Sequence, residues 1–196
     1  MVPTVTLLAT FVLAGCSSGG TDSSSTPSTT SPAPPTTVVP GGCADFRGST
    51  TSLSAKSTGT VGFLTDAQVE QLDCLDKITF TFDPAAGEPP GYTVQYQDVA
   101  KESLTDCGEP ITLPGNAFLV VVLQPAASNN PFLPVDDQQT YRGNLRLQYR
   151  GAHHLEIVQK TCDGEGTVNW IIGLDGVRPF VVDRAENPSR VNVLIG

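Results

Sequence analysis

Polar and apolar residues alternate over two short segments near the middle of the chain, residues 77–83 and 92–97. Alternation with a period of two places every second side chain on the same face of a strand. The apolar positions that share a face are Ile78, Phe80 and Phe82 in the first segment, and Tyr92, Val94 and Tyr96 in the second. Both segments are therefore predicted to be β-strands with one buried face.

Another segment, residues 117–123, is apolar on both faces, which predicts a strand that runs through the middle of the domain. Shorter apolar runs predict further strands, at residues 155–158, 167–172, 178–182 and 191–195. Turn-forming residues separate these strands, and Asp175-Gly176 is typical of a short hairpin between Leu174 and Val177.

A single segment points to helix. Thr65-Asp66-Ala67-Gln68 resembles a capping box in front of Val69 and Leu72, and it predicts one or two helical turns or a loop. The chain has no long amphipathic helix and no internal repeat. Many short strands with frequent turns favour an all-β domain, an antiparallel β-sandwich or a flattened barrel with little or no helix.

The N-terminal region has a different pattern. Its apolar run, residues 5–13, is too short to cross a bilayer, which takes about 20 helical residues. The run ends in Leu13-Ala14-Gly15-Cys16, which is typical of a lipoprotein signal peptide over residues 1–15 with Cys16 as the acylated residue. No Lys or Arg precedes the run, and the alternative is an ordinary secreted protein in which Cys16 is incidental.

Residues 16–42 are predicted to be a disordered tether that begins at the lipidated cysteine. Of the 26 residues after Cys16, 22 are Ser, Thr, Pro or Gly, so the segment has almost no apolar surface to bury. The folded domain then covers residues 43–196. This order places the domain at the outer face of the cytoplasmic membrane, anchored by its lipid.

The chain is acidic, with 20 Asp and Glu against 11 Lys and Arg. The formal net charge of −9 makes a nucleic-acid partner improbable, because phosphate backbones repel an acidic surface. No cofactor motif is present.

Four cysteines remain after Cys16, and none of them forms a Cys-x-x-Cys pair. An even number in an exported domain indicates two disulfides, for which three connectivities are possible. Cys43 lies beside the tether and Cys74 lies just before the first clear strand, so that pairing would fix the entry of the chain. We therefore predict Cys43–Cys74 and Cys107–Cys162.

Candidate catalytic groups are few. The domain has no Gly-x-Ser-x-Gly motif, and its adjacent His153 and His154 would point to opposite faces of a strand and could not share a zinc ion. The carboxylates lie in turn-like contexts, where Asp commonly bonds the backbone: Asp106, Glu109, Asp136, Asp137, Asp163, Glu165 and Asp175. A catalytic carboxylate pair, or a calcium site in the 162–166 turn, remains an alternative. No metal site is predicted.

One aromatic and basic cluster is the candidate ligand surface. Its residues are Tyr141, Arg142, Arg146, Tyr149 and Arg150, in a domain that is otherwise acidic. Such a cluster fits an anionic polymer or a protein partner, and the alternative is an ordinary solvated loop. Trp170, Tyr92 and Tyr96 lie on apolar strand faces and are predicted to belong to the core.

The chain resembles the AMIN-like domain of actinobacterial lipoproteins over roughly residues 60–196. The resemblance rests on Cys74-Leu75-Asp76-Lys77-Ile78, Pro90-Gly91-Tyr92-Thr93-Val94-Gln95-Tyr96, Leu123-Gln124-Pro125-Ala126, Thr140-Tyr141, the run from Glu165 to Gly176, Arg178-Pro179-Phe180 and Pro188-Ser189-Arg190-Val191. It implies a β-sandwich related to the non-catalytic AMIN module, which in cell-wall amidases and secretins contacts peptidoglycan. Residues 66–72 replace the Arg/Gly/His stretch common in relatives. The family's usual cysteine pairing supports Cys43–Cys74.

Together these observations favour a membrane-anchored, non-enzymatic module of the cell envelope that binds peptidoglycan or a wall-associated protein. One alternative is a protein-interaction lipoprotein that recruits an envelope enzyme. Another is a hydrolase with an unrecognised site, for which Asp163, Glu165 and His154 are the candidates.

We expect Cys16→Ser to abolish the incorporation of radiolabelled palmitate in the producing cell, because the thiol is the atom that accepts the acyl anchor. The neighbouring Ser17→Ala should incorporate as much label as the unaltered chain. Equal labelling of both variants would contradict lipidation at Cys16.

Overall fold

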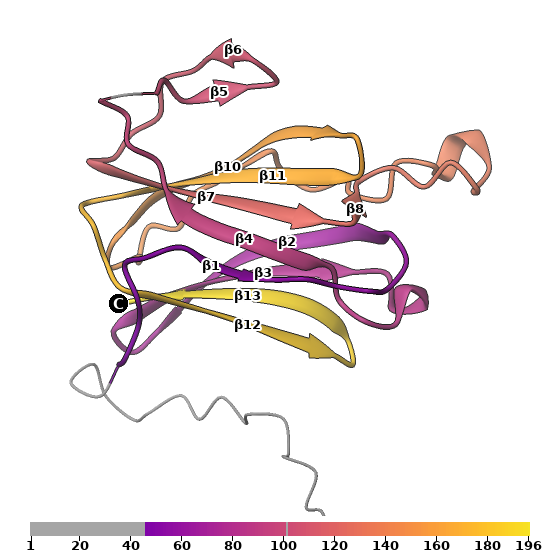
Figure 1. The fold of residues 1–196 in the computed structure, drawn as a ribbon, viewed down its shortest axis with the longest axis horizontal. Coiled ribbons are helices and arrows are strands. Elements are labelled where there is room, and N and C mark those ends of the chain that lie inside the picture. The colour runs from indigo at the N-terminus through magenta and orange to yellow at the C-terminus, as the bar shows by residue number, and fades with distance from the viewer. Residues whose placement is uncertain (1–45, 101) are drawn as a thin grey trace, which may run out of the picture. The chain divides into compact units, whose positions relative to one another are not determined.

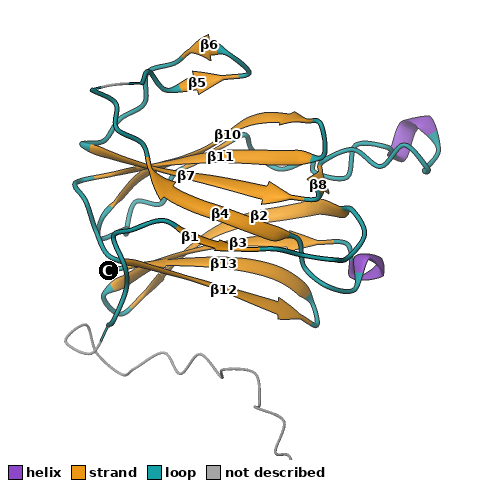
Figure 2. Ribbon diagram, viewed as in Figure 1, coloured by secondary structure: helices purple, strands orange, loops and turns teal. Residues whose placement is uncertain are grey.

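A computed structural model describes residues 46–100 and 102–196. The predictions for the signal peptide, Cys16, the tether and Cys43 lie outside the described residues. The described part of the chain is built from strands and contains no α-helix, as predicted; it has two short 3-10 helices, η2 (Pro84–Ala86) and η3 (Val135–Asp137) (Figures 1 and 2). No helix in these residues is long and apolar enough to cross a membrane.

The strands form two sheets and one small ribbon (Figure 1). The first sheet is antiparallel, in the spatial order β1 (Leu53–Ala55), β4 (Gly91–Tyr96), β7 (Ala117–Gln124), β11 (Thr167–Leu174), β10 (Leu155–Gly164) and β9 (Arg146–Leu147). The second sheet has the order β12 (Phe180–Glu186), β13 (Ser189–Ile195), β3 (Leu75–Phe82), β2 (Gly62–Leu72) and β8 (Ala126–Ala127), with only β8 parallel to its neighbour. The ribbon pairs β5 (Thr105–Asp106) with β6 (Glu109–Pro110).

The apolar faces of the two large sheets pack against each other and form the main core. Trp170 of β11 and Phe80 of β3 are both fully buried, and their ring centroids lie 5.2 Å apart. The predicted faces are confirmed, since Ile78, Phe80, Phe82 and Val94 have no exposed surface, while Tyr92 and Tyr96 pack partly buried against the core. Large aromatic side chains contribute most to such a core because each buries about 150–250 Å².

Strand β7 is an inner strand of its sheet, as its apolar faces predict. One face points into the main core. The other, through Phe118, joins a second cluster in which Leu104 and Leu113 from the 97–116 segment cover Ile157 and Ile171. A strand covered on both sides has no face that needs to be polar, which explains its continuous apolar sequence.

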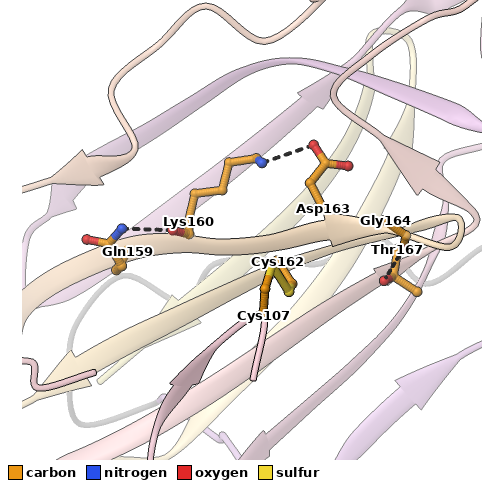
Figure 3. Close-up of a disulfide and its surroundings, with 7 residues drawn as sticks. All are labelled: Cys107, Gln159, Lys160, Cys162, Asp163, Gly164 and Thr167. Atoms are coloured by element: carbon orange, nitrogen blue, oxygen red, sulfur yellow. Dashed lines mark hydrogen bonds and ion pairs between the residues drawn. A yellow bond between two sulfur atoms is a disulfide. The ribbon is translucent and has the colours of Figure 1, made fainter. Parts of the chain in front are cut away.

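The predicted disulfide Cys107–Cys162 is present and ties the β5–β6 turn to β10 (Figure 3). Cys162 lies within the strand rather than in a loop. Cys74 is also disulfide-bonded. Because Cys43 lies outside the described residues, the pairing Cys43–Cys74 stays a prediction.

The helical turns predicted after Thr65 are wrong, since residues 62–72 form β2. Ala67 and Val69 lie opposite Phe80 and Ile78 of β3, so pairing with β3 buries their side chains in the sandwich. The carboxylate of Asp66 accepts a hydrogen bond from the N–H of Ala67 at 2.9 Å and does not cap a helix. A capping pattern is a local signal, and the apolar strand pairing outweighs it.

The hairpin predicted at Asp175-Gly176 is also wrong. The strand before it, β11, belongs to the six-stranded sheet, whereas β12 belongs to the other sheet. Residues 175–179 therefore cross from one sheet to the other. The strand predicted at 178–182 begins instead at Phe180 and continues to Glu186. Gly and Asp mark a change of chain direction but do not specify which strand the next one pairs with.

A buried carboxylate joins the two sheets at one end of the sandwich. Asp76 of β3 has no exposed surface. Its oxygens accept hydrogen bonds from the backbone N–H groups of His153, His154 and Leu155, at 2.7–3.1 Å. Leu155 begins β10 in the opposite sheet, so this one side chain fixes where the strand starts.

We expect Asp76→Ala to lower the free energy of unfolding by about 3 kcal/mol, because one buried and two partly buried N–H groups lose their acceptor. The matched variant Glu156→Ala removes an exposed carboxylate from β10 and should change stability by less than about 0.5 kcal/mol. Urea denaturation followed by Trp170 fluorescence measures both. Similar midpoints for the two variants would contradict the role of Asp76.

Candidate functional site

An open cleft of about 420 Å³ lies between the 128–145 segment and strand β10. Its lining residues are Ser128, Asn129, Val135, Gln138, Gln139, Tyr141, Leu145, Lys160 and Asp163. Two other clefts, of about 480 Å³ beside β1 and β4 and about 310 Å³ beside the disulfide, have no ion pair among their lining residues. The first cleft is therefore the strongest candidate site in the described part of the chain.

An ion pair forms the floor of this cleft. The Lys160 ammonium lies 3.0 Å from the carboxylate of Asp163, and the two side chains are 8% and 26% exposed (Figure 3). Asp163 also accepts hydrogen bonds from Ser128, through the backbone N–H at 3.2 Å and through Oγ. An irregularity in the β10–β11 register between Lys160 and Asp163 brings both side chains to the cleft. The carboxylate thus compensates the charge of the lysine and holds the first residue of the loop.

Tyr141 forms the inner wall of the cleft. Only 2% of it is exposed, and its ring packs edge-on against Trp170 with centroids 5.8 Å apart. Its hydroxyl donates a 2.6 Å hydrogen bond to the carbonyl oxygen of Asn144. Burial, reinforced by the charge of Asp66, raises the pKa of Tyr141 to about 12, so the hydroxyl remains a donor. Tyr141, which was assigned to the candidate ligand surface, is therefore a buried residue whose ring covers Trp170, although it still lines the cleft.

The other four residues of the predicted aromatic and basic cluster are on the surface but do not line the cleft. Arg142 donates to the carbonyl oxygens of Asp136 and Gln139, at 2.6 and 3.1 Å, and so holds the loop that forms one wall. Arg146 of β9 donates to Gln159 at 2.9 Å. Tyr149 and Arg150 are exposed in the turn that follows β9.

The two histidines make different contacts, and both lie just before β10 rather than within a strand. His153 Nε2 lies 2.6 Å from the carbonyl oxygen of Asp73, whereas His154 Nδ1 lies 3.2 Å from the carboxylate of Asp175. Arg178 also contacts that carboxylate, at 2.7 and 3.0 Å. Its guanidinium, with His154, holds the pKa of Asp175 at about 2, below the ordinary 3.8.

The described residues contain one group of potential metal-ligating atoms, from Asp106, Cys107 and Cys162. Both cysteine sulfurs are already joined in the disulfide. In the 162–166 turn, which was considered for calcium, Asp163 is held by Lys160 and Ser128, while Glu165 is exposed at a positive φ of 54°.

The cleft is equipped to hold a polar, uncharged group. Gln138 and Gln139 each donate through Nε2 to a backbone carbonyl, at 3.3 and 3.2 Å, and each keeps an Oε1 acceptor. Asn129 adds another amide, and the aliphatic side chains of Val135 and Leu145 line the same opening. Amide groups beside aliphatic surface can bind ligands that carry both hydroxyl or amide groups and apolar faces.

Sequence reasoning identified Tyr141 and Asp163 but missed the other lining residues. Ser128, Gln138 and Gln139 stand in a loop with no regular pattern, and Lys160 occupies an ordinary strand position. Their convergence depends on the return of the loop onto β10, where the N–H of Lys160 donates to the carbonyl oxygen of Leu145 at 2.7 Å. No periodicity in the sequence carries that information.

A two-sheet β-sandwich with an open polar cleft beside a hydrogen-bonded loop has the architecture of a β-sandwich binding module. The model of the AMIN-like domain family matches residues 62–195, and the chain belongs to this family. Membership makes it a cell-wall-related module of a generally non-catalytic kind and implies an extracytoplasmic place in the cell envelope. No curated protein and no solved structure gave a significant match.

We expect the contribution of Asp175 to stability to be complete above about pH 5 and to disappear as the pH falls toward 2. Its pKa is lower in the folded chain than in the unfolded chain, so protonation favours unfolding in that interval. The stability difference between the unaltered chain and Asp175→Asn should therefore shrink between pH 5 and pH 2, as measured by urea midpoints. A difference that stays constant over this range would contradict the ion pair.

Proposed function

We propose that the chain is a membrane-anchored, non-enzymatic module that binds peptidoglycan through the cleft between the 128–145 segment and β10. The observation that carries this proposal is the set of amide and aliphatic side chains around the Lys160–Asp163 ion pair, in which the two charges compensate each other. Membership in the AMIN-like family supports the cell wall as the ligand class. The anchor is the acylated Cys16, followed by the tether of residues 17–42.

The chemistry of the cleft fits the repeating unit of the cell wall. Peptidoglycan carries hydroxyl and acetamido groups along its sugars, which can exchange hydrogen bonds with Asn129, Gln138 and Gln139. Val135 and Leu145 offer apolar contact to methyl groups and sugar faces. Because Lys160 is paired with Asp163, the floor presents no net charge that would select an ionic ligand.

The arrangement around Ser128 favours binding over catalysis. A serine nucleophile needs a neighbouring base that is able to take its proton. Here the hydroxyl of Ser128 bonds the carboxylate of Asp163, which Lys160 already engages. Asp175 is likewise held by Arg178, with its pKa at about 2, and is poorly suited to act as a base near neutral pH.

We expect the full chain to sediment with insoluble, protein-free peptidoglycan, and Asn129→Ala with Leu145→Ala to weaken this binding about tenfold. The two truncations together remove a hydrogen bond and apolar contact, worth about 1.4 kcal/mol or more. Both side chains are exposed, so the fold should persist.

The control pairs Gln95→Ala with Val177→Ala, which removes an exposed amide and an exposed aliphatic group from outside the cleft. It should bind as the unaltered chain does. The proposal fails if the unaltered chain does not sediment, or if both double variants lose binding equally.

A further inference from the structure

The two most exposed large apolar side chains of the described residues, Phe132 and Val135, lie in one loop together with Leu133. Phe132 is 88% exposed, Val135 is 83% exposed and Leu133 is 39% exposed. We call these three residues the apolar tip. The segment that carries the tip and η3 projects beyond the ends of the strands (Figure 2). Adjacent large apolar side chains in solvent are unusual, and they commonly mark an interaction site.

The backbone of the loop is held in place by its own hydrogen bonds. The N–H of Leu133 donates to the carbonyl oxygen of Asn130 at 3.2 Å, and the N–H of Phe132 donates to Asn130 Oδ1 at 3.0 Å. At the base of the loop, the N–H of Asn130 donates to the carbonyl oxygen of Gln138 at 2.7 Å. Pro131 and Pro134 flank Phe132 and Leu133 and restrict the chain further.

Arg142 braces the far side of the loop through its 2.6 Å hydrogen bond to the carbonyl oxygen of Asp136. The tip is therefore presented by a folded loop, and docking would require little ordering of the backbone. Such preorganisation removes part of the entropic penalty of association.

The charges beside the apolar tip indicate which kind of partner can bind there. Asp136 and Asp137 follow Val135 directly, and Arg142 lies 3.7 Å from Asp137, so two acids and one base leave a net charge of −1. Anionic headgroups repel such a loop, whereas membrane-binding loops usually carry basic flanks. A second copy of the chain is disfavoured too, because each copy has a formal net charge of −9.

We propose that the apolar tip docks into a partner protein whose surface has an apolar recess bordered by basic side chains. Phe132 fills the recess, and the carboxylate of Asp136 meets the basic border. Val135 also lines the cleft, whereas Phe132 and Leu133 are not among its lining residues, so the docking contact centred on Phe132 extends beyond the proposed peptidoglycan contact.

The test places a photo-activatable benzophenone amino acid at position 132 of the full chain in the producing cell. The same probe at position 177 is the control, because Val177 is 63% exposed and lies outside the loop. We expect a discrete protein adduct from position 132 and none from position 177. The captured protein is then purified, and its Kd for the full chain is measured by calorimetry.

Phe132→Ser should raise that Kd at least about tenfold, as expected for truncation of an aromatic side chain that is buried in the complex. Asp136→Lys should raise it severalfold at low salt, and Val177→Ser should leave it within twofold. Phe132→Ser should still sediment with peptidoglycan, which separates failure of this proposal from failure of the proposed function. An adduct with lipid, no adduct, equal adducts at both positions, or an unchanged Kd for Phe132→Ser would overturn it.

Discussion

The packing of Trp170 is the constraint on which both the fold and the cleft depend. Its ring lies between Phe80 of the opposite sheet and Tyr141 of the cleft loop, with centroids 5.2 and 5.8 Å away. One fully buried side chain thus joins the two sheets and supports the inner wall of the cleft. Because protein interiors are close-packed, a change at this ring would reach the cleft through Tyr141 without touching the ligand surface itself.

Carboxylates complete this framework at three places. Asp76 fixes the start of β10, Asp163 joins Lys160 to Ser128, and Asp175 pairs with Arg178. Each acid has a structural partner, either backbone N–H groups or a basic side chain. Some of the chain's carboxylates therefore hold strands and loops in place. A carboxylate held in this way is a weak candidate for general acid or base chemistry, which agrees with a generally non-catalytic family.

The loop between β8 and β9 presents two chemically different surfaces. Its inner side lines the polar cleft, and its outer end exposes Phe132 and Val135. Both depend on the same hydrogen bonds and on the brace from Arg142. A rigid sandwich that carries its contact groups on a held loop is a common way to place function at the edge of a stable scaffold.

The amino-acid sequence was enough to predict the fold class, most of the strands, the buried faces around Phe80 and Val94, and the Cys107–Cys162 pair. The strands and their faces follow from local alternation and turn residues. The cysteine count left three connectivities, and the positions of Cys43 and Cys74 along the chain selected among them. Three-dimensional packing, by contrast, made residues 62–72 a strand, took residues 175–179 from one sheet to the other, and buried Tyr141 in the core. It also brought Ser128, Lys160 and Asp163 together. These outcomes depend on pairing and packing between segments distant in sequence, and no local pattern encodes them.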